Sequence, residues 1–304
     1  MGTGILRVGA SAAGAIVVFT LATCPQAHGL TFDVNNTADA ADALIDGTCA
    51  TTAVPPVCTL RAAIQEANAT IESDVINLPD GKYVLKLVGA GEDNAATGGL
   101  DILHDLTING AGAKAIIRGK KDRVFQIATE TPVTMRDLTI SKGKLGKKGD
   151  SGSEFSGGGI RNEGDLTLER VVVANNTAAH GGGGISSSGG SLTLTDVTVR
   201  NNKSLDDDGG GFDLGESTVT LTRVTISKNK SADEGGGIEA TDDSVVTMTN
   251  CTVSGNSAKA QGGGLRNENG AALALTNVTI AGNKGGRAVG SIPRRPRGLQ
   301  PSRT

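Results

Sequence analysis

The sequence predicts a parallel β-helix, a solenoid in which each coil of the chain stacks on the coil before it. Three observations support this fold class. A triple glycine followed by one large apolar residue recurs along the chain, each recurrence is followed by two short runs that alternate apolar and polar residues, and each unit ends in asparagine. The triplets begin at Gly157, Gly182, Gly209, Gly235 and Gly262, so successive units are 25, 27, 26 and 27 residues long.

The alternating runs predict strands. In one unit Leu192-Thr-Leu194 is followed by Val197-Thr-Val199. A period of two turns one face inward and the other to water, which is typical of a half-buried strand and not of a helix. Units of this length are too short for propeller blades and lack the helix of leucine-rich or ankyrin repeats. We therefore expect three strands per coil.

Equivalent residues of successive coils are expected to form columns. The asparagine column is expected at a turn, where Asn tolerates unusual φ values and bonds the local backbone. The glycines are expected where a side chain would not fit or where φ must be positive. Cys251 shares a column with valines, which indicates a buried core residue and not a nucleophile. The asparagines are Asn176, Asn202, Asn229, Asn256 and Asn283.

The same pattern extends weakly upstream. Runs near residues 133–140 and 100–108 match further coils, and residues 76–85 match the opening coil. Before it, Leu60, Ala63, Ile64 and Ala67 have helical spacing, which predicts a short amphipathic helix that caps the open end of the solenoid. We divide the chain into a signal peptide (1–29), an N-terminal cap (30–75), the β-helix (76–284) and an atypical basic tail (285–304).

The two ends of the chain predict export and an irregular terminus. Arg7, an apolar segment over residues 8–22 and small residues at 27–29 have the order of a signal peptide. We expect a secreted or cell-surface protein with no membrane span in the mature chain. Residues 21–24 also resemble a lipobox, although Thr23 is unusual at its position in that motif. The tail is rich in proline and arginine, which cannot continue the strands. We expect either a truncated or frame-shifted end or a genuine basic tail.

Two cysteines bracket a short loop in the N-terminal cap. Cys49 and Cys58 are separated by eight residues. An oxidising compartment favours a disulfide between them, and two free buried thiols are the alternative.

The N-terminal block resembles a known family. Cys58-Thr-Leu-Arg-Ala-Ala-Ile, preceded by Phe32-Asp-Val-Asn-Asn-Thr-Ala-Asp and followed by Asp74-Val-Ile-Asn-Leu-Pro-Asp-Gly, resembles the bacterial CSLREA-motif proteins. The triple-glycine repeats are similar to those of polymorphic outer-membrane adhesins. Thr59 and Ala62 replace the serine and glutamate of the motif. The resemblance implies an exported right-handed parallel β-helix and supplies no catalytic residue.

Composition narrows the classes of ligand. The chain has five Phe, one Tyr and no Trp, which leaves little material for stacking on sugars or bases. A net charge of −3 argues against general binding of nucleic acids. The partners that remain are surface glycans or cell-surface proteins.

A cluster of acidic residues is the candidate metal site. Ca²⁺ is the one cofactor that the sequence suggests. Asp207 and Asp233 precede their glycine triplets at the same offset, so they are expected to stack about 4.8 Å apart on adjacent coils. Bound Ca²⁺ would relieve the repulsion between like charges, and solvation by water is the alternative. The candidate ligands are Asp206, Asp207, Asp208, Asp233 and Glu234.

Other polar residues give weaker signals. The histidines His28, His104 and His180 are too scattered for a catalytic or zinc site and are expected to be solvated. A basic group is expected to be either a set of solvated loops or a patch that binds a polyanion. Its members are Lys120, Lys121, Arg123, Lys142, Lys144, Lys147 and Lys148.

These observations favour an exported, non-enzymatic scaffold for adhesion or interaction with the cell envelope. The alternative is a polysaccharide-active enzyme similar to the pectate lyases. Such an enzyme needs long turns that build a concave wall, and the turns here are short and nearly equal in length.

Overall fold

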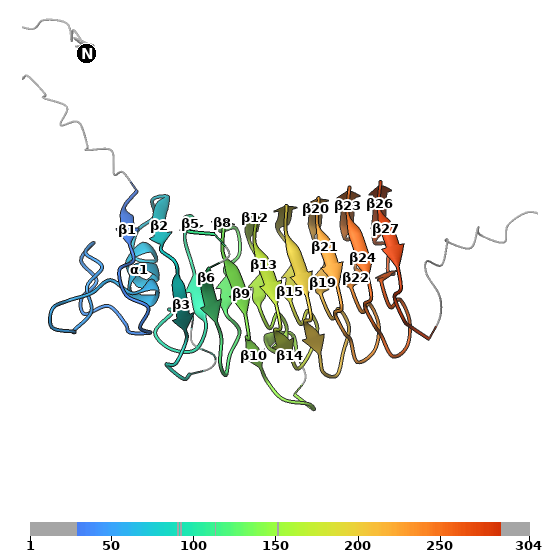
Figure 1. Ribbon diagram of the computed structural model, residues 1–304, viewed down its shortest axis with the longest axis horizontal. Coiled ribbons are helices and arrows are strands. Elements are labelled where there is room, and N and C mark those ends of the chain that lie inside the picture. The colour runs from blue at the N-terminus through green and yellow to red at the C-terminus, as the bar shows by residue number, and fades with distance from the viewer. Residues whose placement is uncertain (1–28, 90, 92, 113, 151, 287–304) are drawn as a thin grey trace, which may run out of the picture.

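Parallel pairing between equivalent residues of successive coils organises the chain. The computed structural model describes residues 29–89, 91, 93–112, 114–150 and 152–286. The expected signal peptide and basic tail lie almost wholly outside these residues. The described strands form four parallel sheets that run along one solenoid axis, so the predicted β-helix is confirmed (Figure 1).

Sheet A lines the first side of each coil. Its five-residue strands alternate buried apolar residues with exposed or half-buried polar residues, as in β16 and β20. In spatial order its strands are β1 (Thr31–Asp33), β2 (Asp74–Leu78), β5 (Leu106–Gly110), β8 (Pro132–Arg136), β12 (Asp165–Glu169), β16 (Ser191–Thr195), β20 (Thr218–Thr222), β23 (Val245–Thr249) and β26 (Ala272–Thr276).

Sheet B follows sheet A within each coil. A residue with positive φ separates the two strands, for example Arg170 at 53° and Arg223 at 55°, and turns the chain between them. The strands are β3 (Gly81–Val84), β6 (Ala115–Arg118), β9 (Thr139–Ser141), β13 (Val172–Ala174), β17 (Thr198–Arg200), β21 (Thr225–Ser227), β24 (Thr252–Ser254) and β27 (Thr279–Ala281).

Sheets C and D complete each coil. Sheet D is a short ladder of β10 (Lys144–Leu145), β14 (Thr177–Ala178) and β18 (Lys203–Ser204), and isolated bridges continue it through Lys230, Ser257 and Lys284. The glycine triplets lead from it into sheet C, whose strands are β4 (Leu100–Ile102), β7 (Phe125–Ile127), β11 (Ile160–Asn162), β15 (Ile185–Ser188), β19 (Phe212–Gly215), β22 (Ile238–Thr241) and β25 (Leu265–Asn267). A coil thus has a fourth short strand that the sequence pattern did not predict.

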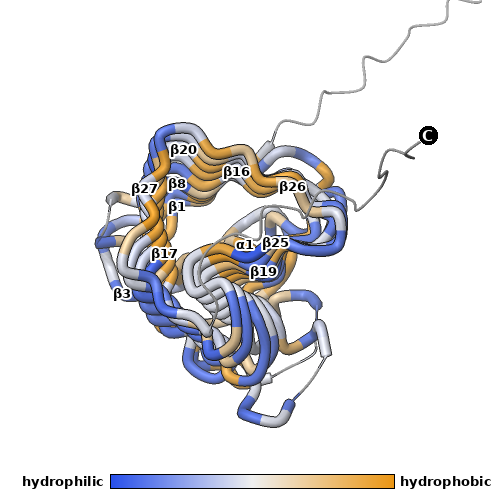
Figure 2. The backbone as a smooth tube through the Cα atoms, turned by 90° about the vertical axis from the view of Figure 1, so that its right-hand side faces the viewer, coloured by the Kyte–Doolittle hydropathy of each residue, from blue (hydrophilic) through white to orange (hydrophobic). Residues whose placement is uncertain are grey.

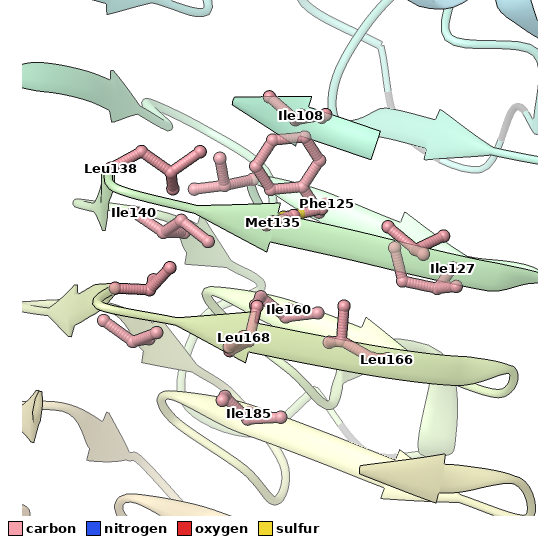
Figure 3. Packing of buried hydrophobic residues seen from close by; sticks show 14 of the residues in the cluster. Ile108, Phe125, Ile127, Met135, Leu138, Ile140, Ile160, Leu166, Leu168 and Ile185 are labelled. Carbon is pink, nitrogen blue, oxygen red and sulfur yellow. The ribbon is translucent and has the colours of Figure 1, made fainter. Parts of the chain in front are cut away.

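The core is a stack of aliphatic residues inside the coils. Equivalent side chains lie in register, as in the pair Leu168 and Leu194, and both are fully buried. Phe125 and Phe212 enter the core from sheet C. Figure 3 shows this packing for the coils around Phe125, and Figure 2 shows how the coils superpose along the axis. Cys251 is 2% exposed among the core residues, as its column predicted.

The asparagine column forms a hydrogen-bonded ladder. The backbone N–H and the Nδ2 group of Asn229 both donate to Oδ1 of Asn256, at 2.9 and 3.1 Å. Nδ2 also donates to the carbonyl of Val199 in the preceding coil, at 3.0 Å. These asparagines do not themselves have positive φ. The residue before each of them does, for example Asn201 at 55° and Lys228 at 55°.

The glycine triplet satisfies both of its expected constraints. The first glycine has positive φ, for example 63° at Gly182. A Cβ atom on the second, Gly183, would collide with the backbone of Lys203, and one on Gly184 would collide with the backbone of Gly211. The triplets therefore allow neighbouring coils to approach closely in the segment that connects the strands of sheet D to those of sheet C.

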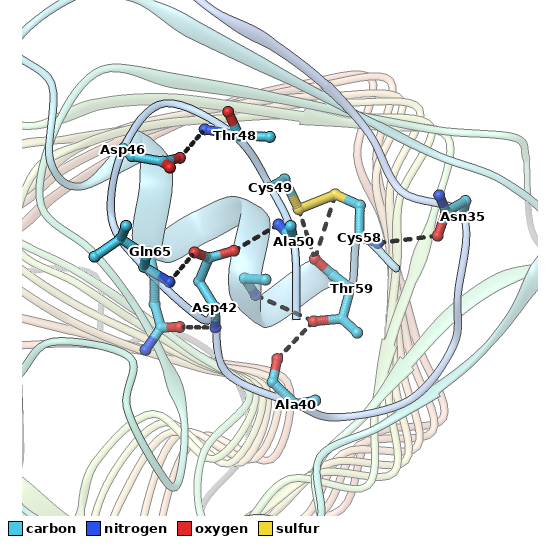
Figure 4. Close-up of a disulfide and its surroundings, with 12 residues drawn as sticks. Asn35, Ala40, Asp42, Asp46, Thr48, Cys49, Ala50, Cys58, Thr59 and Gln65 are labelled. Atoms are coloured by element: carbon cyan, nitrogen blue, oxygen red, sulfur yellow. Dashed lines mark hydrogen bonds between the residues drawn. A yellow bond between two sulfur atoms is a disulfide. The ribbon is translucent and has the colours of Figure 1, made fainter. Parts of the chain in front are cut away.

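A helix and a disulfide close the N-terminal end of the solenoid. Helix α1 (Leu60–Ala67) confirms the predicted cap, and Thr59 caps its N-terminus by accepting from the Ala62 N–H at 3.2 Å. Cys49 and Cys58 form the disulfide next to it (Figure 4). Elsewhere, residues Ser153–Phe155 form a single 3-10 turn. No helix among the described residues is long and apolar enough to cross a membrane.

Arg61 on α1 ties the cap to the first coils. It is 1% exposed, and its Nε donates to Asp39 Oδ1 at 2.6 Å. Its remaining nitrogens donate to the carbonyls of Ala95, Gly98 and Gly99 at 2.8 to 3.2 Å. The guanidinium thus satisfies four acceptors in a segment that has little regular structure.

We predict that Asn229→Ala destabilises the fold by roughly 3 kcal/mol, because it leaves the backbone N–H of Asn202 buried without its partner and removes one of the hydrogen bonds to the carbonyl of Val199. Urea unfolding followed by circular dichroism measures the change. Asn201→Gly is the control, because the residue is exposed with positive φ and glycine accepts that conformation. An equal effect of both substitutions would contradict a special role for the ladder.

We also predict that Arg61→Met costs about 3 to 5 kcal/mol, since it strands the buried carboxylate of Asp39. Arg223→Met is the matched control. Arg223 Nε also lies 2.6 Å from an aspartate oxygen, on Asp196, but its side chain is 52% exposed, so we expect a much smaller loss of stability. Thermal and urea unfolding of both variants distinguish the two cases.

Candidate functional site

The outward face of sheet C carries the densest group of ionisable side chains. The middle residue of each strand points away from the core, and loop residues that precede the strand shield several of these positions. Glu239 on β22 is only 1% exposed because Gly235, in the glycine triplet, lies against it. In the end-on view, looped segments lie beside β19 and β25 (Figure 2). The column consists of Asp101, Gln126, Arg161, Ser186, Asp213, Glu239 and Arg266.

Three carboxylates from two adjacent coils lie close together, and two of them pair with Arg266. We call Asp208, Glu234 and Glu239 the acidic cluster, and one oxygen from each lies within 4.8 Å of the others. Nη1 of Arg266 lies 2.6 Å from Oε2 of Glu234 and 2.6 Å from Oε1 of Glu239. Nη2 donates to Glu268 at 2.5 Å. One guanidinium therefore faces more carboxylates than it can neutralise.

Burial makes the acidic cluster hold protons near neutral pH. It raises the pKa of Glu239 to about 8, although the hydrogen bond from Arg266 opposes this rise. It also raises the pKa of Asp208 to about 6, although Oδ1 of Asp208 accepts the Glu234 backbone N–H at 2.6 Å. Oε2 of Glu239 is buried and has no hydrogen-bond partner among the described residues. A carboxyl group in this setting is more stable neutral than charged.

Asp213 lies beside the acidic cluster on β19. Burial, followed by the charges of Asp207 and Asp208, raises its pKa to about 7. Arg266 behaves in the opposite way. Burial lowers its pKa, but the hydrogen bonds to Glu268 and Glu239 outweigh that effect and hold the net pKa above its ordinary value. The guanidinium is therefore always charged, whereas the pKa values of Glu239 and Asp213 lie near neutrality.

The structure separates the five residues that the sequence analysis grouped as one calcium site. Asp208 and Glu234 belong to the acidic cluster. Asp207 instead lies 2.8 Å from Nε2 of His180, and Asp206 accepts the Gly149 N–H. Asp233 is exposed, although its backbone stacks on Asp207 as predicted, with N–H to O at 3.4 Å. The predicted register of Asp207 with Asp233 was correct, but the side chains of the five acidic residues do not converge on one site.

His180 differs from its expected solvated state. It is half-buried between two partners, with Nδ1 3.3 Å from Ser156 Oγ and Nε2 facing Asp207. The 3-10 turn at Ser153–Phe155 brings Ser156 into reach. The pair orders the long loop of one coil against the next coil.

Sequence reasoning missed Glu239, Asp213 and Arg266. All three occupy the second position after a glycine triplet, so their equivalent places in the repeat could have identified them as one column. This column was missed because outward positions of a strand normally face solvent. Only the folded structure shows that a loop covers the outward positions of sheet C. Calcium binding stays a prediction. Its ligands would be Asp208, Glu234 and Glu239, next to a guanidinium that already supplies one positive charge.

A match to a family of known proteins agrees with the fold. The family model "Right handed beta helix region" matches residues 107–291, and the chain belongs to this family. Among solved structures, the pectate lyase Pel9A superposes with a TM-score of 0.48 at 14% identity, covering 84% of this chain and 64% of the lyase. The A-module of mannuronan C-5 epimerase AlgE4 from Azotobacter vinelandii has a TM-score of 0.23 at 16% identity, over 76% and 93% of the two chains. No curated protein matches the sequence.

We predict that stability falls as pH rises from about 5 to about 8. Glu239, Asp208 and Asp213 have raised pKa values in the folded state, so the native state binds more protons than the unfolded state in this window. Their contribution is complete below the ordinary carboxyl pKa and is lost as pH rises through the folded values. Urea unfolding across this range measures the slope.

Glu239→Gln is the variant that isolates the largest of these three pKa shifts. It is neutral at every pH, so its stability should fall less steeply than that of the wild type between about pH 5 and pH 8. Glu216→Gln, on an exposed turn, is the control and should keep the wild-type slope. An unchanged slope in Glu239→Gln would show that Glu239 is ionised throughout.

Proposed function

We propose that this protein is an exported, non-enzymatic β-helix scaffold that binds cell-envelope or other cell surfaces. The observation that carries the proposal is a set of threonine columns on the outer surfaces of sheets A and B, which we call the threonine face. One column runs through six consecutive coils of sheet A in unbroken register. Its members are Thr107, Thr134, Thr167, Thr193, Thr220 and Thr247.

Two further columns widen this threonine face. Thr195, Thr222, Thr249 and Thr276 stack two residues further along the strands of sheet A. Thr198, Thr225, Thr252 and Thr279 stack on sheet B. Each threonine presents one hydroxyl donor, two acceptor lone pairs and a methyl group, and none is long enough to hold a partner away from the sheet. From β16 to β26 the outward positions of sheet A carry no charged residue, and this regular, neutral surface suits a broad contact with another surface.

The chemistry of the cap supports export. The Cys49–Cys58 disulfide is a feature of proteins in oxidising compartments. Together with the signal peptide that the sequence predicts, it supports a secreted or cell-surface location. The resemblance of the cap to the CSLREA-motif proteins and of the repeats to outer-membrane adhesins favours adhesion as the role.

A polysaccharide-active enzyme is the second candidate, and one observation favours it. Asp208 and Glu239 titrate near neutrality beside the permanent charge of Arg266, which is the combination that general acid–base catalysis uses. Against it, the carboxylates of the cluster are occupied by Arg266 and by a backbone N–H. The scaffold is therefore the function that we place first.

Binding of the purified mature protein to intact cells and isolated envelopes, measured by sedimentation, tests the proposal. We expect binding by the wild type and a loss of roughly tenfold or more in Thr220→Arg/Thr247→Arg, because two long cations disrupt a flat contact. Thr129→Arg, in an exposed turn outside the threonine face, is the control. Equal binding by both variants would contradict the role of this face.

The same preparation is incubated with acidic and neutral polysaccharides, with and without Ca²⁺, and assayed for reducing ends and unsaturated products. The scaffold account predicts no turnover. Turnover that disappears in Asp208→Asn or Glu239→Gln would overturn it and establish the enzyme.

A further inference from the structure

Lysines repeat along one edge of the solenoid. The outward position of sheet D and of the bridges that continue it forms one column through six coils. Four of its six residues are lysine, and all four lysines are exposed. The column reads Lys144, Thr177, Lys203, Lys230, Ser257 and Lys284.

Neighbouring columns add more cations to the same edge. Arg118 and Arg200 share an outward column of sheet B, at the end of the strand that leads to this edge. Lys142 and Lys228 share the turn position with positive φ that follows it. We call the following nine residues the basic edge: Arg118, Lys120, Lys142, Lys144, Arg200, Lys203, Lys228, Lys230 and Lys284.

The charges of the basic edge are not neutralised within the protein. None of the nine residues forms an ion pair with a described residue, and no acidic residue occupies their columns. Other cations of the solenoid behave differently. Arg170 and Arg223 pair with aspartates of the coil before them, and Arg266 with three glutamates. The basic edge is therefore available to an external anion.

A groove marks the most basic part of this edge. It has a volume of about 890 Å³ and lies where β6, β9 and sheet D meet. Four cations of the basic edge line it together with two residues whose side chains offer neutral hydrogen-bonding groups, and no acidic residue contributes to its walls. The lining consists of Val84, Arg118, Gly119, Lys120, Lys142, Gly143, Lys144, Asn175 and Thr177.

We propose that the basic edge binds a linear anionic polysaccharide, seated in this groove and extended along the solenoid axis. The column from Lys144 to Lys284 spans five coil spacings, or about 24 Å. Its cations recur at intervals of one or two coils, as the acidic groups of such a polymer recur along the chain of sugars. Asn175 and Thr177 supply hydrogen bonds for hydroxyl groups. This inference rests on the proposed function and names the ligand class of the scaffold.

The observations favour a sugar polymer over a nucleic acid. Proteins that bind single strands stack the bases on exposed aromatic rings. Phe32, Phe125, Phe212 and Tyr83 are buried, and Phe155 lies in the loop after sheet D and outside the groove lining. The edge offers charge and small polar groups without a stacking platform, which suits a flexible chain of carboxylated or sulfated sugars.

Isothermal titration of the whole mature protein with polygalacturonate tests the inference, with neutral dextran and a single-stranded DNA oligonucleotide as competing probes. We expect saturable binding of polygalacturonate that weakens with added salt, and no binding of dextran. The triple variant Lys144→Gln/Lys203→Gln/Lys230→Gln should bind roughly tenfold or more weakly, because each lysine contributes a screened charge interaction.

The matched control is Lys82→Gln/Lys114→Gln/Lys259→Gln, which removes the same charge from exposed lysines outside the basic edge and should keep wild-type affinity. Circular dichroism and thermal unfolding verify that both variants fold. Equal losses in the two variants, equal binding of dextran, or tighter binding of DNA than of polygalacturonate would overturn the inference. Binding of intact cells without binding of polygalacturonate would overturn the ligand class and leave the scaffold standing.

Discussion

The register between coils is the constraint on which the structure depends. Every described strand pairs in parallel with its equivalent one coil away, so a shift of one residue would turn the core outward along a whole strand. The asparagine ladder enforces this register at the corner between sheets B and D. Each side chain, such as that of Asn202, bonds the next asparagine and also a carbonyl of the preceding coil, Val173. The glycine triplets let the coils approach closely enough for these bonds to form.

The same register distributes the surface chemistry. Because equivalent residues stack, the character of a column becomes the character of a strip along the molecule. The threonine face, the basic edge and the acidic cluster therefore occupy different sides of each coil. One coil illustrates this arrangement within a short stretch of sequence. Thr193 lies on the threonine face, Lys203 on the basic edge and Asp208 in the acidic cluster. The protein can therefore present a neutral contact face and a charged edge on different sides of the same coils.

The sequence predicted the features that follow from local pattern. The strands of the repeats, the helix at residues 60–67 and the burial of Cys251 were expected from period, spacing and column. Strand β1 was not, because three residues carry too little pattern to reveal pairing with β2. Sheet D was missed for the same reason, since its strands have two residues each.

The candidate site was predictable only in its backbone register. Glycine spacing placed Asp207 over Asp233, but side-chain direction depends on tertiary partners such as His180. The burial of Glu239 depends on a loop that folds back over sheet C, which no periodicity encodes. The basic edge required the alignment of short bridges such as Lys203 with Lys230, whose sequence context gives no strand signal.

Native-state amide hydrogen exchange is the most direct test of the register. The account predicts that the backbone amides of Asn202, Asn229 and Asn256, which bond to side chains of the next coil, exchange among the slowest in the protein. They should exchange with the strands of sheets A and B and far more slowly than the exposed residues 147–149. Exchange of the asparagine amides as fast as that loop would contradict a solenoid locked by its asparagine ladder.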